Sequence, residues 1–276
     1  MENIVTKLGL GEVENVCEGL VVGRLGHVTV VLLDRPERRN AFTPDMMAAF
    51  GPLWQRLDTD GRTRCIVFGT TSDEFFCSGI DVKKVAESGE AGVDLPWGRG
   101  PFLTTKHAYV YTPVICAVEG AVVGGGMHFV LDADVVIAGE SATFFDTHTM
   151  LGLVGSTETA GLTVKAGLGA ALYFGLGGTK ARLTAGHAHS LGLVQEVVPD
   201  RTALSRAIEF AGYVAAASPS ATKRTIEVAW AGANLGYEEA LRFGRSVAAR
   251  QREHPDWREG PRAFAEKRAP VWQDTL

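Results

Sequence analysis

Apolar runs rich in β-branched residues alternate with helical patterns between residues 20 and 140. The run Val28–Leu33 ends at Asp34-Arg35-Pro36, where proline removes a backbone donor and fixes φ. Similar runs occupy residues 65–68, 114–118 and 135–138. Strands that alternate with helical stretches predict an α/β fold with parallel pairing.

A strong helix signal follows the first of these runs. Thr43 offers a capping hydroxyl, Pro44 suits the first helical position, and apolar residues recur at helical spacing as far as Leu57. From Arg201 onward the signals are again helical, and three prolines punctuate them: Pro219, Pro255 and Pro261. We therefore expect a loose N-terminal extension over residues 1–19, a core over 20–200 and a helical region over 201–276.

Composition narrows the class of protein. A hydrophobic content of 46% and a charged content of 21% are ordinary for a soluble domain, and no run reaches the ~20 apolar residues of a membrane span. The net charge of −5 argues against nucleic-acid binding. Four cysteines without a CxxC pair favour buried reduced thiols and a cytoplasmic location. No dinucleotide or Walker pattern is present, so we expect neither a dinucleotide nor ATP.

Three segments carry the candidate chemistry: residues 76–81 (FCSGID), 119–128 (EGAVVGGGMH) and 144–148 (FFDTH). Each follows a β-prone run, and the small residues allow backbone N–H groups to approach a ligand closely. The second and third segments each contain a histidine, His128 and His148. The pattern predicts an oxyanion hole flanked by two acid/base groups.

Six segments in this order resemble the crotonase (enoyl-CoA hydratase/isomerase) superfamily over most of the chain; they are residues 33–42, 76–81, 117–126, 132–134, 191–194 and 263–268. The resemblance implies a crotonase-like spiral of ββα units and a helical C-terminal oligomerisation region that packs subunits into a homotrimer or a dimer of trimers. It also implies an acyl-CoA thioester as the ligand, with coenzyme A as part of the substrate and no separate cofactor or metal.

The resemblance further implies where the thioester carbonyl binds. In the superfamily, two backbone N–H groups hold the carbonyl oxygen, and here they belong to Ile80 and Gly125. Preorganised donors of this kind meet the negative charge that develops on the oxygen as an enolate forms.

The chain departs from the superfamily at the acid/base positions. Hydratases of this superfamily carry a glutamate two residues after the glycine triplet and a second one twenty positions later, where this chain has His128 and His148. An imidazole, with a reference pKa near ~6.5, exchanges protons near neutral pH. It cannot reproduce two carboxylates that accept hydrogen bonds from one water. We expect poor hydration of straight-chain enoyl-CoAs.

Several interpretations of the two histidines remain open. In the active one, His148 is the general acid/base and His128 shapes or hydrogen-bonds the substrate. In another, the chain is a non-catalytic acyl-CoA-binding homologue. A metal site is disfavoured, because Asp146 and His148 would project to opposite faces of an extended segment.

A hydrolytic reaction on a carbon–carbon bond or a thioester is a further alternative. Crotonase-like β-diketone hydrolases resemble this chain in having a histidine four residues before a glycine, here His148 and Gly152. They pair that histidine with a nearby acid, for which Glu158 is the candidate. Glu158 either orients His148 or stabilises the start of a helix.

The resemblance also assigns residues to coenzyme A. Arg39 and Ala41 occupy the first adenine-pocket segment, and the second segment together with the glycine turn supplies Ser78, Gly79, Asp81, Val82, Lys83 and Gly124. Lys83 suits phosphates as a flexible point charge. In the helical tail, Phe264 and Lys267 match residues that reach the nucleotide, sometimes that of a neighbouring subunit.

The remaining candidates are expected to be mainly structural. Residues 86–101 predict a mobile loop near the site, with Trp97 and then Phe102 able to close over an acyl chain. His107 could line the acyl pocket. His187 and His189 are expected at the surface, far from the chemistry.

Overall fold

Two β-sheets form the frame of the protein in the computed structural model, which describes residues 8–81, 83–84 and 103–274. Within these residues the larger sheet has the strand order β1-β2-β3-β4-β6-β8-β11, and the smaller one has the order β10-β9-β7-β5. From β3 through β11 the larger sheet is parallel, whereas β1 and β2 pair antiparallel at one end.

The strands of the larger sheet are β1 (Gly11–Cys17), β2 (Leu20–Leu25), β3 (Val28–Leu33), β4 (Cys65–Thr70), β6 (Val114–Val118), β8 (Val135–Gly139) and β11 (Glu196–Val198). Those of the smaller sheet are β5 (Phe75–Cys77), β7 (Ala121–Val123), β9 (Thr143–Phe145) and β10 (Leu183–Thr184).

The helices are α2 (Pro44–Thr59), α4 (Met127–Asp132), α5 (Ser156–Ala166), α6 (Leu168–Gly177), α7 (Ala185–Ser190), α8 (Ala203–Ala215), α9 (Pro219–Asn234), α10 (Tyr237–Glu253) and α11 (Asp256–Ala265). Four single 3₁₀ turns are η1 (Pro36–Arg38), η2 (Gly124–Gly126), η3 (Thr149–Leu151) and η4 (Gly178–Lys180).

The chain repeats one unit as it moves between the sheets. β6 of the larger sheet is followed by β7 of the smaller sheet and then by η2 and α4, and β8 is followed by β9, η3 and α5. The smaller sheet pairs β5, β7 and β9 in parallel, so the ends of these three strands lie side by side. This repetition confirms the predicted spiral of ββα units and brings the three candidate segments to one edge.

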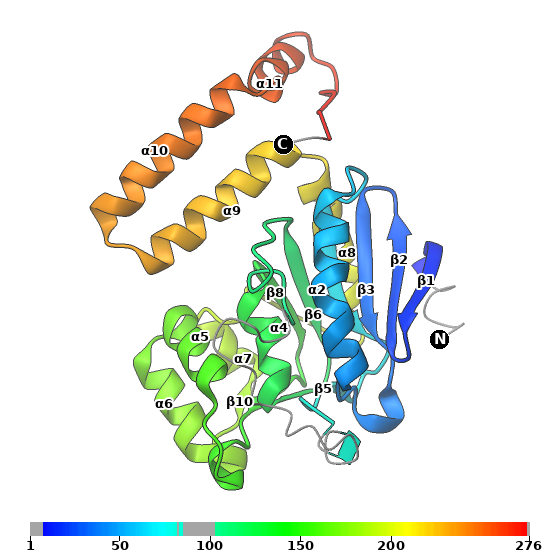
Figure 1. Ribbon diagram of the computed structural model, residues 1–276, viewed down its shortest axis with the longest axis vertical. Coiled ribbons are helices and arrows are strands. Elements are labelled where there is room, and N and C mark those ends of the chain that lie inside the picture. Colours follow the sequence, from blue (N-terminus) through cyan, green and yellow to red (C-terminus); the bar gives the residue numbers. More distant parts are fainter. Residues whose placement is uncertain (1–7, 82, 85–102, 275–276) are drawn as a thin grey trace.

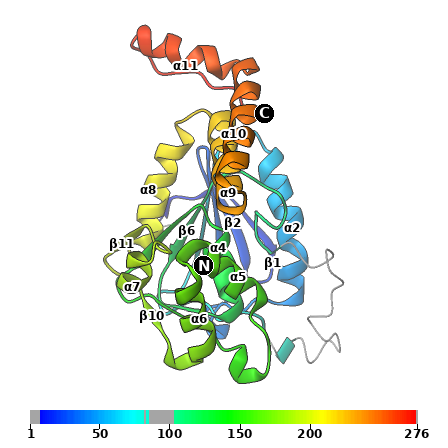
Figure 2. The same ribbon diagram turned by 90° about the vertical axis from the view of Figure 1, so that its left-hand side faces the viewer.

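Strands β3, β4 and β6 of the larger sheet are buried on both faces, as their continuous apolar runs predict. Residues such as Val31, Phe68 and Cys116 face a core shared with α2, α4 and the smaller sheet. The alternate residues face α8, which covers the opposite side of the sheet (Figures 1 and 2). Its buried alanines at positions 203, 207, 211 and 215 form a narrow stripe that lets the helix pack closely.

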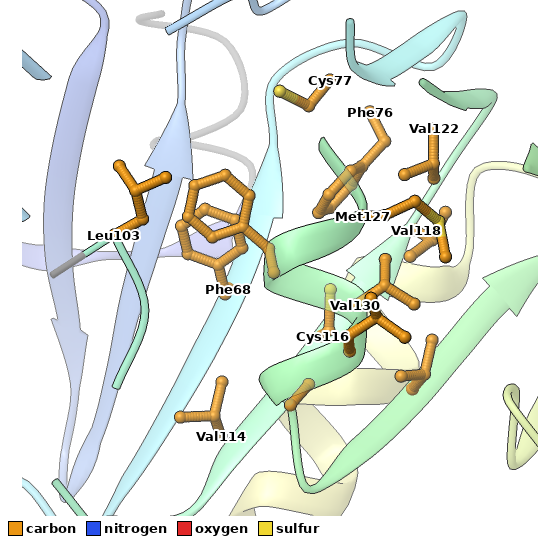
Figure 3. Close-up of a cluster of buried hydrophobic side chains, with 14 of the residues drawn as sticks. Phe68, Phe76, Cys77, Leu103, Val114, Cys116, Val118, Val122, Met127 and Val130 are labelled. Atoms are coloured by element: carbon orange, nitrogen blue, oxygen red, sulfur yellow. The ribbon is translucent and has the colours of Figure 1, made fainter. Parts of the chain in front are cut away.

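The core beneath the site is aromatic and sulfur-rich (Figure 3). The ring of Phe68 stacks on Phe129 of α4 at 4.4 Å between centroids and meets Phe76 edge-on at 6.0 Å. Trp54 of α2 closes this cluster and donates its indole N–H to the carbonyl of Leu103 at 2.9 Å. These contacts fix α4, and with it His128, against the larger sheet.

Helix α2 begins where the sequence predicts. The hydroxyl of Thr43 accepts from the N–H of Met46 at 3.2 Å, and Pro44 occupies the first turn.

Two features differ from expectation. Residues 11–17, in the expected extension, form strand β1 against β2, and Pro261 lies inside α11 rather than between helices. The division of the chain into three regions remains a prediction.

The C-terminal helices confirm the predicted helical region. α9 and α10 form an antiparallel arm that leads to α11, away from the smaller sheet (Figure 1). Val82, Trp97, Phe102 and the expected mobile loop at 86–101 lie outside the described residues. No described helix is long and apolar enough to cross a membrane.

We predict that Gly126→Ala destabilises the fold. A Cβ at Gly126 would lie 2.6 Å from the carbonyl oxygen of Cys77, so β5 and the start of α4 would have to separate. Overpacking of this kind costs about 1–3 kcal/mol. Gly212 in α8 is the matched control, because a Cβ there meets no described atom within 4 Å. Gly212→Ala should be neutral or stabilising by up to about 1 kcal/mol in urea unfolding; equal losses in both variants would contradict the prediction.

Candidate active site

Two glycine turns touch each other at the edge of the smaller sheet. Gly79 follows β5 with φ +86°, and Gly125 is the second residue of η2, which follows β7. A Cβ built on Gly79 would lie 3.1 Å from the nitrogen of Gly125, so a side chain would force the turns apart. The N–H of Gly125 has no acceptor inside its own helical turn, because first-turn donors never do.

A short backbone bridge to Phe42 holds the first turn. The N–H of Phe42 donates to the carbonyl of Gly79, and the N–H of Asp81 donates to the carbonyl of Phe42, each at 2.9 Å. In such a parallel bridge, Phe42 bonds to the carbonyl of Gly79 and to the N–H of Asp81, the two residues that flank Ile80. The N–H of Ile80 itself therefore points away from Phe42. Asp81 is further held by the buried Arg35, at 3.3 Å.

Four side chains form a connected cluster beside the glycine turns. His148 Nδ1 lies 2.5 Å from Asp146 Oδ1, and His128 Nε2 lies 2.7 Å from Glu158 Oε1. The two pairs meet at Glu158, whose Oε1 is 3.9 Å from His148 Nε2. We call His128, Asp146, His148 and Glu158 the histidine–carboxylate cluster. A Cβ built on Gly124 would lie 3.5 Å from His148 Cε1, which places this ring against the glycine turn.

The pairings differ from those expected from sequence. Asp146 and His148 do not project to opposite faces, because residues two apart on an extended segment share a face. The strand itself ends at Phe145, and His148, the cap of η3, has helical angles (φ −56°, ψ −53°). Asp146, not Glu158, therefore orients His148 through a ring N–H. Glu158 lies in the first turn of α5 and binds His128 instead.

The electrostatics of the cluster follow from burial and these pairings. The hydrogen bond to Asp146 raises the pKa of His148 above its ordinary value, although burial of the ring opposes this. Burial would raise the pKa of Glu158, but the hydrogen bond and charge of His128 outweigh it, so the pKa lies below its ordinary value. Glu158 is therefore a carboxylate that accepts from His128. The other nitrogen of His128, Nδ1, is buried without a partner among the described residues, so no nitrogen of this ring is offered to a ligand.

Part of the predicted coenzyme A segment lies next to the glycine turns. Ser78 donates its N–H to the carbonyl of Arg39 at 3.1 Å, which joins the two predicted adenine-pocket segments. Arg39 itself lies over the ring of Phe75 at 5.0 Å. Ala41 is buried, whereas Lys83 is exposed.

The structure does not bring Phe264 and Lys267 to this site within one chain. Both belong to the end of the C-terminal arm, at the opposite end of the molecule from the smaller sheet (Figure 1). The side chain of Phe264 is 88% exposed. Their assignment to coenzyme A remains a prediction that requires a neighbouring copy of the chain.

His107 meets the ring of His128 edge-on at 6.2 Å, so it does lie near the cluster. His187 and His189 are exposed on α7, as expected. Asp134 accepts from the N–H of Val114, twenty positions earlier in the chain, at 2.9 Å. Among the described residues, no group of three or more His, Cys, Asp or Glu side chains could hold a metal ion.

Sequence reasoning missed Asp146. The available signal was an aspartate two residues before a histidine at the end of a β-prone run, because side chains two apart on an extended segment lie on one face. The resulting site combines closely placed backbone donors, two histidines and two buried carboxylates. Such a set can hold a developing oxyanion and move a proton beside it.

Comparisons with known proteins identify the family of the chain. A family model for enoyl-CoA hydratase/isomerase matches residues 24–275. The enoyl-CoA hydratase EchA19 of Mycobacterium tuberculosis is 32% identical over 92% of this chain and 96% of its own, and a carnitinyl-CoA dehydratase of Proteus mirabilis is 32% identical over 90% and 95%. The crystal structure of an enoyl-CoA hydratase/isomerase from Mycobacterium paratuberculosis has a TM-score of 0.83 at 32% identity, with 93% and 99% of the two chains covered.

The repeated ββα unit, the paired glycine turns and similarity along nearly the whole chain lead to one conclusion: the chain belongs to the enoyl-CoA hydratase/isomerase (crotonase) family.

Proposed function

We propose that the protein is an acyl-CoA enzyme that forms a thioester enolate, with His148 as the proton-transferring group. The thioester oxygen lies between the N–H groups of Ile80 and Gly125. Contact between the two glycine turns carries this proposal, together with the position of the His148 ring against Gly124. Each oxyanion donor lowers such a barrier by about 3–4 kcal/mol.

The reaction begins with proton abstraction from the substrate. The neutral imidazole of His148 accepts a proton at Nε2 from a substrate carbon or a water, and the two N–H groups hold the enolate oxygen. The imidazolium then returns the proton. Glu158, held by His128, supplies a fixed negative charge next to the ring that becomes positive. This arrangement revises the predicted contact between His128 and the substrate, because His128 acts through Glu158.

Hydrolysis of a carbon–carbon bond or of the thioester is the second candidate. The observation that favours it is the bond between His148 and a buried aspartate, since a histidine held by a carboxylate is well suited to activating water. Turnover of a panel of enoyl-, dienoyl- and β-keto-acyl-CoAs distinguishes hydrolysis from the first candidate reaction, because hydrolysis releases a carboxylic acid or free coenzyme A. Binding of acyl-CoA without turnover of any member would indicate a non-catalytic homologue.

We predict that His148→Ala lowers turnover of the best substrate in this panel by about 10²–10⁴-fold, the usual cost of losing a positioned acid/base group. Acyl-CoA affinity should stay close to that of the unmodified protein, since the oxyanion donors are backbone groups. In the unmodified protein, kcat/KM should rise with pH through the raised pKa of His148, because only the neutral ring accepts a proton.

The exposed His187 of α7 provides the control, and His187→Ala should keep full activity. An unchanged rate in His148→Ala would contradict the proposal. So would vigorous hydration of crotonyl-CoA by the unmodified chain.

We also propose that three copies assemble through an apolar surface. α6 exposes Leu168, Tyr173 and Leu176, the last at 75%, and Val154, which precedes α5, is also exposed. Apolar side chains gathered in this way favour contact with another chain. A second copy is the favoured occupant because the resemblance implies trimers or dimers of trimers.

Trp230 of α9 donates its indole N–H to Asp134 within its own chain. Tyr237 and Leu241 of α10 remain exposed.

Sedimentation velocity at micromolar concentration should show a trimer or a hexamer. Leu176→Asp should shift the distribution toward monomer, because it places a charge on the apolar surface. Tyr213→Ser, at a 60% exposed position of α8, should leave the distribution unchanged. A monomeric unmodified chain would rule out this assembly.

A further inference from the structure

The carboxylate of Asp146 is buried and held by several N–H groups. Its side chain is 2% exposed, and one oxygen, Oδ1, faces three N–H groups. They belong to the ring of His148 at 2.5 Å, the backbone of Thr147 at 2.8 Å and the backbone of His148 at 3.3 Å. The two backbone donors fix the carboxylate, so its position does not depend on the ring.

This contact determines which nitrogen of His148 carries the proton in the neutral ring. An ionised carboxylate only accepts hydrogen bonds, so Nδ1 must be the donor to Asp146. The lone pair of the neutral ring is then on Nε2. Nε2 lies 3.9 Å from Glu158 Oε1, and that oxygen already accepts from His128 at 2.7 Å. Nε2 is therefore left available to a ligand.

Gly155, before α5, leaves room for this arrangement. A Cβ there would lie 3.1 Å from Asp146 Oδ2 and 3.3 Å from His148 Nδ1. Both distances are tight for a side-chain carbon. The carboxylate and the ring thus pack against the backbone of α5 on one side, and against Gly124 on the other.

We propose that Asp146 is a positioning residue that holds His148 with Nδ1 protonated and Nε2 directed to the acyl group. The proposal rests on the assignment of His148 as the proton-transferring group. It adds a second task for Asp146, which is to stabilise the imidazolium that forms when Nε2 accepts a proton. No bond of the substrate is formed or broken at Asp146.

The groups around His148 support this division of roles. Asp146 faces it from its own segment and Glu158 from α5, while His128 of α4 lies behind Glu158 and His107 packs on His128. Burial would raise the pKa of Asp146, but the hydrogen bond and charge of His148 outweigh it and leave the pKa below its ordinary value. Asp146 therefore stays ionised in the range where His148 titrates.

Two substitutions separate charge from orientation. In Asp146→Asn, the N–H groups of Thr147 and His148 should keep the amide oxygen at the Oδ1 position, so the ring remains oriented and only the negative charge is lost. In Asp146→Ala both charge and acceptor are lost. A purely structural role predicts a loss of stability in both variants, with the enolate amplitude of the folded protein unchanged.

The probe is acetoacetyl-CoA, whose enolate has its own ultraviolet absorption band. In the unmodified protein the band should grow with pH as His148 becomes neutral, with a midpoint above the ordinary histidine value of about 6.5. Asp146→Asn should move the midpoint to lower pH and lose less amplitude than Asp146→Ala, because the ring stays oriented. Asp146→Ala should lose amplitude by about 10- to 100-fold, the scale seen when the carboxylate partner of a metal-bound histidine is removed.

Asp256→Asn is the matched control. Asp256 is also buried and lies near a histidine, His254, but in the C-terminal arm. It should destabilise the fold without moving the midpoint. An unmoved midpoint in Asp146→Asn would overturn the proposal, as would equal amplitudes in Asp146→Ala and the unmodified protein.

A measurement on the unmodified protein covers the case in which neither variant folds. ¹⁵N histidine spectra at high pH should show His148, assigned by its absence in His148→Ala, with Nδ1 protonated; a proton on Nε2 would overturn the proposal. If His148→Ala keeps full turnover and a full enolate band, the proposed function itself fails. If His148→Ala loses turnover and the enolate band while the Asp146→Asn midpoint is unmoved, only the proposed role of Asp146 fails.

Discussion

Close contact between backbone segments is the constraint on which the rest of the site depends. Gly126 lies directly against the carbonyl of Cys77, and Gly125 lies against Gly79, so η2 and the turn after β5 are separated by little more than van der Waals distance. Only residues without a Cβ allow this approach. Once it is made, α4 has a fixed starting point, the aromatic rings of Phe68 and Phe129 can stack, and His128 points toward α5.

The histidine–carboxylate cluster shows how burial and pairing act together. Two carboxylates, Asp146 and Glu158, are almost completely enclosed, which alone would favour their neutral forms. Each instead has a histidine within hydrogen-bond distance, and the pKa of each lies below its ordinary value. The same contacts make the imidazolium form of His148 more stable. The cluster is thus a set of coupled groups whose protonation states depend on one another.

Much of the fold could be predicted because its signals are local. The strand at Val28–Leu33 and the helix after Thr43 depend on residue types next to each other in sequence, and both were correct. The glycine turns were found for the same reason. The pairing of His128 with Glu158 could not be predicted, because it depends on where α5 begins. The pairing of His148 with Asp146 was accessible from the sequence, because side chains two apart on an extended segment share a face, so the expectation of opposite faces was wrong.

The repeated unit also has a consequence for how such a site can change over evolution. The proposed oxygen-binding groups are backbone N–H groups from the turns after β5 and β7, whereas the proton-handling side chains come from α4, the turn after β9 and α5. Substitutions at positions 128, 146, 148 and 158 can therefore alter the protonation chemistry while the backbone contact between Gly79 and Gly125 stays intact. In the proposed mechanism, the ββα spiral therefore separates the groups that hold the oxygen from those that move the proton, so the second set can change without rebuilding the first.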